Sequence, residues 1–255
     1  MIDLHAHILP EIDDGPPTIE DALEMARVAV AAGTKAIATT SHIGYVFDLG
    51  PDDITRARTA LQTRLAEEGI ELELLAGGEI APERLPDLDD EALRALALGG
   101  GPYVLFECPF APVGAGMEMM VADLQRRGFG VLLAHPERSA SFQRDLGLLT
   151  RMVERGALAQ VTTGSLAGGF GDIPRRAALA MIEQGLAHVL ASDAHDPIRR
   201  GPDLRTAGGV LDEAQHEWMT ATAPAAIVAG RPLPPRPELP RRRGMRGRLR
   251  SWSAR

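Results

Sequence analysis

Several histidines of this chain stand at the ends of short apolar segments, where they could bind a metal ion. The first apolar segment contains His5 and His7, and later segments are followed by His42, His135 and His195. In a strand, successive side chains point to opposite faces, so both side chains of a His-x-His pair point to the same face. The pair therefore predicts a shared metal site. The alternative is a pair of histidines that line a barrel without any metal.

Carboxylates stand in similar positions along the chain. Glu79 follows the segment LLAGG, Glu107 ends the segment YVLFE, and Asp193 lies in SDAH. Asp14 lies in a turn rich in glycine and proline, where it or Asp13 could serve only as a turn residue. A glutamate that ends an apolar segment is costly to bury unless it is paired or bound to a metal. A solvated loop carboxylate is the alternative for each one alone. The predicted ligands are His5, His7, Asp14, His42, Glu79, Glu107, His135, Asp193 and His195.

This ligand set is too large for a single ion, because one zinc site uses about four ligands. Mixed imidazole and carboxylate ligation suits Mn²⁺, Fe²⁺ or Zn²⁺. We therefore expect two or three divalent ions that share bridging carboxylates. Three such ions would carry more positive charge than the four carboxylates neutralise, so the site would attract a dianion such as a phosphate monoester. Metal clusters also generate hydroxide near neutral pH and bind phosphoryl oxygens.

Two arginine-containing segments follow predicted ligands. Arg138 lies three residues after His135 in HPER, and Arg199 and Arg200 follow the histidine of SDAHDPIRR. Arginine binds phosphate in a bidentate manner and stabilises charge during phosphoryl transfer. These arginines are therefore candidates for phosphate binding, with a surface salt bridge as the alternative role of each.

Two other kinds of chemistry are not expected. Cysteine phosphatases use a Cys-x₅-Arg motif, but the residue six positions after Cys108 is Gly114. The glycine-rich segments lack the Gly-Lys-Ser/Thr of a P-loop, and no GxGxxG opens a helix after a strand. Covalent cysteine catalysis and nucleotide binding therefore have no support, and Cys108 is expected to be a small buried residue.

The elements that must position these residues alternate between strand and helix. The expected strands are residues 2–7, 35–40, 71–76, 102–107, 130–134, 157–162 and 187–191. The expected helices are residues 18–32, 51–68, 89–97, 115–127, 143–155, 174–184, 203–213 and 215–229. Such alternation predicts an α/β fold with a parallel sheet or barrel. The carboxyl ends of its strands share one face, where the predicted ligands would meet.

The composition is that of a globular protein with an unusual C-terminal segment. The 255 residues are 45% apolar and 24% charged, which is ordinary for a globular domain and enough for a large core. Seven of the 27 basic residues lie in 241–255, so the first 240 residues carry 20 basic against 35 acidic residues. An acidic body is not typical of a nucleic-acid-binding domain, so no nucleic-acid partner is expected. The basic segment alone could contact an anionic surface.

The domain is expected to end near residue 230. From Arg231 the sequence becomes RPLPPRPELPRRR, and proline at this density cannot continue a helix or a sheet. We therefore expect one domain over 1–230 and an extended, mobile arm over 231–255. The single cysteine fits a reducing cytoplasm, and the N-terminus is not that of a signal peptide. No segment approaches the about 18 consecutive apolar residues of a membrane span, so a cytoplasmic location is expected.

The motifs as a set resemble those of a known superfamily. DLHAHILPEIDDG, TSH, GGE, FE, AHPER and SDAH are similar to the motifs of the polymerase and histidinol phosphatase (PHP) superfamily. They resemble most closely the CpsB/CapC-type bacterial tyrosine phosphatases of capsule and exopolysaccharide operons, over residues 1 to about 230. The resemblance implies a distorted (β/α)₇ TIM-like barrel and a three-metal centre that is usually assigned as manganese. It also implies hydrolysis of phosphotyrosine on the tail of a membrane-bound bacterial tyrosine kinase that controls polysaccharide export.

The resemblance also implies how the ligands divide. By motif, the first ion would be held by His5, His7, Glu79 and Asp193. The second would be held by Glu79, Glu107 and His135. The third would be held by Asp14, His42 and His195. Arg138 and Arg200 would bind the phosphate. If the partner kinase is a membrane protein, the basic arm could also recruit the chain to an anionic membrane surface, with a disordered solubilising tail as the alternative.

The second expected strand departs from the family pattern. The family often has Thr-Pro-His-His there, whereas this chain has Thr-Thr-Ser-His at 39–42, followed by the unusual loop IGYVFDLG at 43–50. This loop would border the substrate entrance, so the departure concerns the substrate. Two alternative functions stay open. One is a PHP phosphoesterase for a small phosphate monoester such as histidinol phosphate, and the other is a non-catalytic module that binds a phosphorylated tail. The complete ligand set argues against the second.

Overall fold

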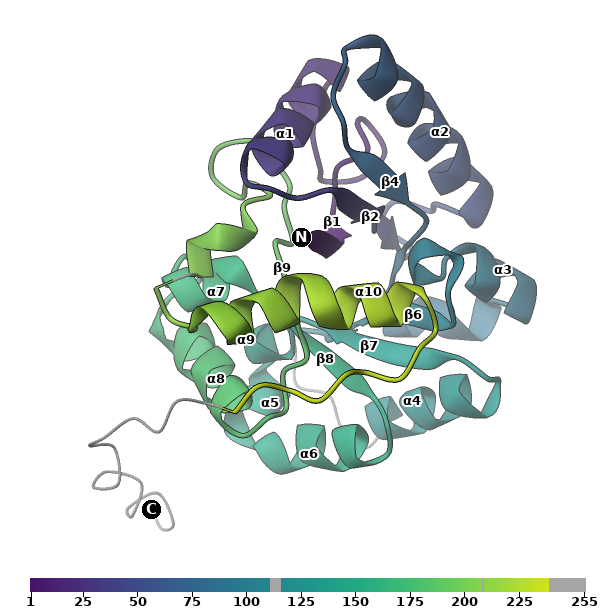
Figure 1. The fold of residues 1–255 in the computed structure, drawn as a ribbon. Coiled ribbons are helices and arrows are strands. Elements are labelled where there is room, and N and C mark those ends of the chain that lie inside the picture. The colour runs from purple at the N-terminus through teal and green to yellow at the C-terminus, as the bar shows by residue number, and fades with distance from the viewer. Residues whose placement is uncertain (111–115, 208, 239–255) are drawn as a thin grey trace.

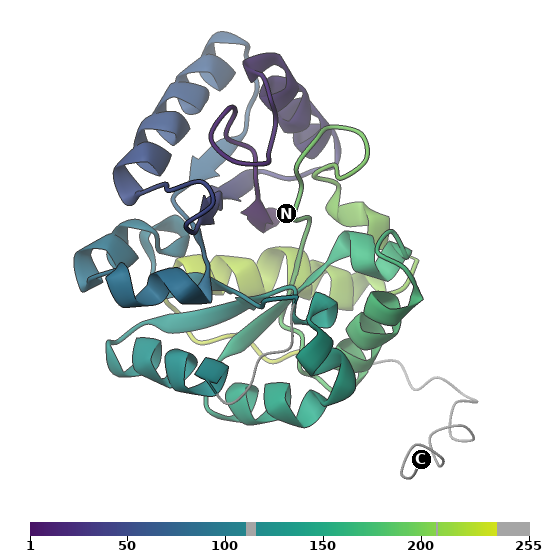
Figure 2. The same ribbon diagram turned by 180° about the vertical axis from the view of Figure 1, so that it is seen from behind.

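The computed structural model describes residues 1–110, 116–207 and 209–238, and Figures 1 and 2 show the fold from opposite sides. These residues form strands that all pair in parallel. The strands are β1 (Ile2–Ala6), β2 (Ala36–Thr39), β3 (His42–Ile43), β4 (Glu73–Leu75), β5 (Glu79–Ile80), β6 (Tyr103–Glu107), β7 (Gly130–Ala134), β8 (Leu158–Thr162) and β9 (Val189–Ala191).

The strands occupy seven positions around a distorted barrel. Their hydrogen bonds define two sheets, with the orders β1-β2-β4 and β3-β5-β6-β7-β8-β9. The second and third positions are each broken in two, because β3 continues the course of β2 and β5 continues that of β4. The barrel closes where Asp193 N donates to His5 O and His7 N donates to Ala194 O, both at 2.8 Å. The predicted α/β barrel of seven strand positions is therefore confirmed in a distorted form.

Two glycines allow the break between β4 and β5. A Cβ at Gly78 would lie 2.7 Å from Leu96 Cδ2, and a Cβ at Gly77 would lie 3.0 Å from Thr40 Cγ2. Any larger residue at Gly78 would therefore push this part of the chain away from its neighbours. Thr40 itself lies in the break between β2 and β3, so the two breaks are in contact.

Helices surround the barrel (Figure 1). They are α1 (Ile19–Ala31), α2 (Pro51–Glu67), α3 (Asp90–Ala95), α4 (Gly116–Arg126), α5 (Ala140–Arg144), α6 (Leu146–Glu154), α7 (Thr163–Ala167), α8 (Asp172–Glu183), α9 (Glu213–Glu217) and α10 (Ala223–Val228). Shorter 3₁₀ turns are η1 (Pro82–Asp87), η2 (Leu98–Gly100), η3 (Pro136–Arg138) and η4 (Leu204–Ala207), and the π-helical η5 (Trp218–Thr222) joins α9 to α10. Within the described ranges, no helix is both long enough and apolar enough to span a bilayer.

The helix boundaries confirm some of the sequence predictions and correct others. α1 begins as predicted, because Thr18 Oγ1 accepts a hydrogen bond from Asp21 N at 3.1 Å. The single helix predicted over 143–155 is wrong, because Asp145 accepts from Gly147 N and starts α6 separately from α5. The helix predicted over 203–213 is also wrong, since its described residues contain only the short η4 and the N-terminal end of α9.

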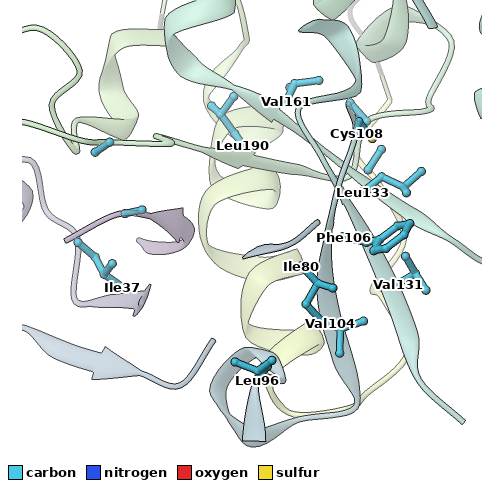
Figure 3. Close-up of a cluster of buried hydrophobic side chains, with 14 of the residues drawn as sticks. Ile37, Ile80, Leu96, Val104, Phe106, Cys108, Val131, Leu133, Val161 and Leu190 are labelled. Carbon is cyan, nitrogen blue, oxygen red and sulfur yellow. The ribbon is translucent and has the colours of Figure 1, made fainter. Parts of the chain in front are cut away.

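Apolar side chains fill both sides of the barrel wall. Outward-facing strand residues such as Val104 and Phe106 pack beneath the surrounding helices (Figure 3). The alternate residues, among them Leu105 and Leu132, point into the barrel and meet Ile227 of α10. Burying one such side chain stabilises the fold by about 1.5–3 kcal/mol. α10 closes the amino end of the barrel, which leaves the carboxyl ends of the strands available for a site.

The segment 231–238 runs as extended chain along the amino end of the barrel (yellow in Figure 1). Trp218 Nε1 and Gln215 Nε2 donate hydrogen bonds to proline carbonyls of this segment, at 3.2 and 2.6 Å. This packing differs from the mobile arm that was expected for the whole of 231–255, because proline prevents helix but leaves its carbonyl available as an acceptor. The basic residues of 239–255 lie outside the described residues.

Candidate metal centre

An extra residue in β1 shapes the backbone that presents the first histidines. Between its pairs with Ile37 and Thr39, β1 advances three residues while β2 advances two. The buried Asp3 carboxylate stabilises this irregular backbone, because Asp3 Oδ1 accepts hydrogen bonds from His5 N at 3.2 Å and Ser192 N at 3.1 Å. Burial raises the pKa of the Asp3 carboxyl to about 6. Asp3 was not among the predicted site residues, yet it joins the first and last strand positions beneath the site.

The described residues bring eight of the nine predicted ligands together at the carboxyl ends of the strands. They form three groups, and within each group the ligand atoms lie within 4.8 Å of one another. The groups are His7, Asp14, His42 and His195; His5, His7 and Asp193; and His5, Glu79 and His135. The groups share His5 and His7, so the three sites form one continuous centre.

The centre of the site lies between two imidazoles and two carboxylates. His5 Nε2 and His7 Nε2 face each other at 3.3 Å. Glu79 Oε2 lies 3.5 Å from each of these nitrogens, and Asp193 Oδ1 lies 3.5 Å from His5 Nε2 and 3.7 Å from His7 Nε2. All four side chains are buried. Two imidazole nitrogens that face each other amid carboxylate oxygens form a set of donors suited to a cation.

Unpartnered polar atoms in the same place support a metal site. His135 Nδ1 is buried and lacks a hydrogen-bond partner within the described part of the chain, and Glu79 Oε2, although 3.0 Å from His42 Nδ1, lacks the geometry of a hydrogen bond. Buried polar side-chain atoms are normally hydrogen-bonded, so each exception needs an explanation such as a bound ion. Oxygen and imidazole nitrogen donors are those that Mn²⁺, Fe²⁺ and Zn²⁺ accept. The residues present therefore fit a centre of divalent ions.

Hydrogen bonds fix the orientation of the central imidazoles. Gln160 Oε1 lies 3.1 Å from His5 Nδ1 and also accepts from His135 N at 3.1 Å. Because this oxygen can only accept, His5 donates through Nδ1 and leaves Nε2 to bind a metal. Asp13 Oδ2 orients His7 in the same way, at 2.8 Å from Nδ1. Asp13 had been expected only as a possible turn residue. Gln160 was not predicted, because its only signal was a polar residue within an apolar strand.

The carboxylates dominate the electrostatic potential of the site. Burial alone would lower the pKa of His7, but the hydrogen bonds and charges of Asp13 and Glu79 outweigh burial and raise its pKa to about 10. Burial alone would raise the pKa of Asp193, but His5 and other nearby cationic groups hold it below its usual range. Carboxylates that lie this close to deprotonated imidazoles would attract divalent cations.

Two of the predicted ligands lie on strained backbone. His135 and Asp193 have φ angles of 35° and 50°, in the left-handed region that non-glycine residues rarely adopt. Such strain costs about 1–3 kcal/mol per residue and is concentrated at functional sites. The turn after His135 is held by the buried Glu137, whose Oε1 accepts from Thr162 N at 2.9 Å and from Ser165 Oγ at 2.7 Å. These bonds attach the arginine-bearing turn to β8 and α7.

Glu107 is the predicted ligand that the structure does not bring into a group, among the residues described. It ends β6 and is only partly exposed. Burial and the nearby charge of Glu79 raise the pKa of its carboxyl. Glu107 therefore stands beside the site as a neighbour of Glu79, and its role as a ligand stays a prediction.

The two predicted phosphate-binding arginines meet at one carboxylate. Arg138 Nη1 and Arg200 Nη2 both donate to Asp193 Oδ2, the latter at 2.8 Å, and Arg200 Nη2 also donates to Asp193 O at 3.1 Å. The Arg138 side chain is 14% exposed and that of Arg200 is 30% exposed. Arg199, by contrast, lies on the surface. The structure thus brings Arg138 and Arg200 to the edge of the metal ligands.

The unusual loop after β3 also lies against the site. The ring of Phe47 stacks on that of His42, with 5.7 Å between ring centres and an angle of 5° between planes. Tyr45 donates a hydrogen bond to Asp87 in η1 at 2.6 Å. Tyr45 and Val46 are exposed. Tyr45 thus attaches the loop to η1, and Phe47 packs the loop against the predicted ligand His42.

The remaining histidines and the cysteine have structural roles. His188 Nδ1 accepts from Ala159 N at 3.2 Å, and His216 Nε2 lies 2.9 Å from Leu204 O. Neither histidine joins a metal-binding group in the described ranges. Cys108 is buried in the outer core, as expected (Figure 3), and burial raises the pKa of its thiol well above the usual value. The thiol is therefore protonated and shielded from solvent.

Comparison with known proteins gives consistent matches over most of the chain. A family model described as capsular polysaccharide synthesis, CpsB/CapC, matches residues 1–222. The tyrosine-protein phosphatase YwqE of Bacillus subtilis is 39% identical over 214 residues, which is 84% of each chain. The tyrosine-protein phosphatase CpsB of Streptococcus agalactiae serotype III is 26% identical over 219 residues, covering 83% of this chain and 89% of that protein.

A solved structure matches as well. It comes from work on YwqE from Bacillus subtilis and CpsB from Streptococcus pneumoniae, described as metal-dependent tyrosine phosphatases. It superposes with a TM-score of 0.82 at 34% identity and covers 95% of this chain and all of the other. The likeness therefore extends over the barrel that carries the ligand groups.

Proposed function

Since the chain belongs to the CpsB/CapC family of capsular polysaccharide synthesis, we propose that it is a metal-dependent phosphatase that hydrolyses phosphotyrosine. One observation carries this proposal beyond the family: three contiguous ligand groups lie next to two arginines at the mouth of the barrel. A phosphate monoester is a dianion, and this arrangement offers it cationic partners on two sides.

The proposed metal ligands would divide as the family pattern implies. One ion would be held by His5, His7, Glu79 and Asp193, a second by Glu79, Glu107 and His135, and a third by Asp14, His42 and His195. The proximity of His7 to the third set supports a shared role for that histidine. Manganese is the proposed ion, with iron or zinc as alternatives for the same donors. When bound, such ions polarise phosphoryl oxygens and lower the pKa of water.

The chain's own residues position the ester. Arg138 and Arg200 would bind the phosphate oxygens, and Asp193 holds both guanidinium groups at the edge of the ligands until the substrate arrives. Each guanidinium keeps further N–H donors besides those bonded to Asp193. Gln160 and Asp13 would keep the imidazoles in the tautomer that binds metal. Cys108 takes no part, because its thiol is buried and protonated.

The proposed substrate is the phosphorylated tail of a bacterial tyrosine kinase that acts in polysaccharide synthesis. The family description and the names of the relatives support this choice. Such a kinase is a membrane protein, so a cytoplasmic phosphatase would meet it at the inner membrane surface. Contact of the basic residues in 241–255 with that surface remains a proposal of its own, because those residues lie outside the described ranges.

A single set of assays tests the function. Purified protein is analysed for metal content and assayed on a phosphotyrosyl peptide and on small esters such as histidinol phosphate, with added Mn²⁺ and with chelator. We expect more than one divalent ion per chain, preference for the peptide and loss of activity in EDTA after slow metal release. Preference for the small ester would favour the metabolite phosphoesterase, whereas tight peptide binding without turnover would favour the binding module. Full activity in excess EDTA would exclude the metal centre.

A further inference from the structure

Two aromatic and two cationic side chains form a cluster at the mouth of the site, and the proposed mechanism does not explain the two rings. The guanidinium carbon of Arg138 lies 4.7 Å from the ring centre of Phe110 and 4.3 Å from that of Phe170. Phe170 also lies 5.7 Å from the guanidinium carbon of Arg200. Phe170 thus contacts both arginines, whereas Phe110 contacts only one.

Phe110 differs from Phe170 in its exposure and in its second neighbour. Its side chain is 51% exposed, although most large apolar residues of the described chain are buried. Its ring also stacks on the ligand His135, with 5.5 Å between ring centres and an angle of 21°. One part of the ring therefore covers a metal ligand and a phosphate-binding arginine, while another part is open to solvent. An apolar ring in this place is available to a substrate that reaches the site.

The direction of the arginine donors determines what lies next to Phe110. Guanidinium N–H groups lie in the plane of the group, so a ring stacked on its face leaves the edge available for phosphate oxygens. A phosphate bound at the edge of Arg138 places the ester oxygen, and the group attached to it, beside Phe110. An aryl group directly bonded to that oxygen comes within the 4.5–7 Å range of aromatic pairs. The short aliphatic carbon of a seryl ester offers no ring to stack.

We propose that Phe110 is a specificity-determining residue that selects aryl phosphates by stacking on the substrate ring, and that Phe170 is a positioning residue for Arg138 and Arg200. The proposal deepens the phosphotyrosine phosphatase function and rests on it. It assigns discrimination between phosphotyrosine and phosphoserine to one exposed ring, with the arginines and metal ligands binding the phosphate that both esters share.

The test compares Phe110→Leu with Phe170→Leu in the full-length, metal-loaded protein. Each is assayed on two peptides of the same sequence that contain either phosphotyrosine or phosphoserine. Phe110→Leu should lower kcat/KM for phosphotyrosine by about 3- to 10-fold more than for phosphoserine, as expected for one aromatic pair. A smaller loss common to both peptides is expected as well, because Phe110 also contacts Arg138 and His135. Phe170→Leu should lower both by a similar factor, because it acts through the arginines. Phe110→Tyr should restore the selectivity.

A binding measurement separates recognition from turnover. Inhibition constants for phenylphosphonate and methylphosphonate report on the aryl group without any bond breaking. Phe110→Leu should weaken phenylphosphonate selectively, whereas Phe170→Leu should weaken both inhibitors. Unchanged thermal unfolding shows that each variant is folded.

The outcomes are distinguishable. A wild-type protein that hydrolyses neither peptide contradicts the proposed phosphatase function, and the assignment of Phe110 falls with it. An active wild-type protein whose peptide selectivity and phosphonate selectivity are both unchanged by Phe110→Leu overturns the assignment of Phe110 alone. A selective loss of phosphotyrosine activity in Phe170→Leu would exchange the roles of the two rings and also refute the proposal.

Discussion

Replacing Gln160 by leucine should weaken metal binding although Gln160 would touch no metal. Its Oε1 accepts from His5 Nδ1 and from His135 N, each at 3.1 Å, and both donors are buried. A buried donor left without an acceptor costs about 1–3 kcal/mol, so the loss of both bonds should cost about 2–6 kcal/mol of folding stability. The His5 ring would also lose the partner that holds its tautomer and orientation, and His135 would lose a bond to its backbone. Loss of such a partner typically lowers metal affinity about 10- to 100-fold.

The measurement is a calorimetric Mn²⁺ titration of the metal-stripped protein, combined with urea unfolding. Gln62→Leu is a matched control, because Gln62 also makes two hydrogen bonds, with Leu72 O and Leu74 N, but joins α2 to the chain at β4, away from the site. Gln62→Leu should lower stability and leave Mn²⁺ affinity unchanged. Gln160→Glu keeps an acceptor oxygen and should bind Mn²⁺ more tightly than Gln160→Leu. Wild-type Mn²⁺ affinity in a folded Gln160→Leu protein would refute the reasoning.

Further changes test other parts of the site. Arg138→Ala and Arg200→Ala should each lower kcat/KM in steady-state assays by roughly 10²-fold, because both arginines are expected to stabilise charge in the transition state. Arg199→Ala should have little effect. A larger loss for Arg199→Ala than for Arg200→Ala would contradict the placement of that loop. Cys108→Ala should retain activity, and a trapped phosphocysteine in mass spectrometry would count against direct hydrolysis. Burial and the nearby Arg236 lower the pKa of His188 from 6.5 to about 4. The unfolded chain therefore takes up this proton more readily than the folded chain. The free energy of unfolding should fall as the pH falls from 6.5 towards 4. Thermal unfolding of His188→Asn should be less sensitive to pH in that range, and equal sensitivity would assign the effect to other groups.

The sequence predicts which side chains come together at the strand ends better than it predicts the residues that support them. His5 and Asp193 could be found because strand ends are marked by the change from apolar to polar residues, and parallel strands bring their ends together. Gln160 and Asp3 carry no such mark, because a single polar residue in an apolar strand has many possible partners. Their roles depend on contacts with residues distant in the chain, at His135 and Ser192.

The barrel follows from periodicity, but its breaks do not. The second and third strand positions are divided because Gly78 passes close to Leu96 and Gly77 passes close to Thr40, contacts that a local pattern cannot reveal. The course of 231–238 could not be inferred from proline content for a related reason. An extended segment is ordered when side chains elsewhere, here Trp218 and Gln215, supply donors to its carbonyls.

The site lies across the seam at which the first and last strands close the barrel. About 190 residues separate His5 from His195, so a ribosome that adds 5–20 residues per second needs roughly 10–40 s to synthesise the second after the first. Until then the N-terminal histidines lack both the carboxylate of Asp193 and the backbone bonds of the seam. The groups proposed to bind metal are therefore completed only after the last strand position has been synthesised.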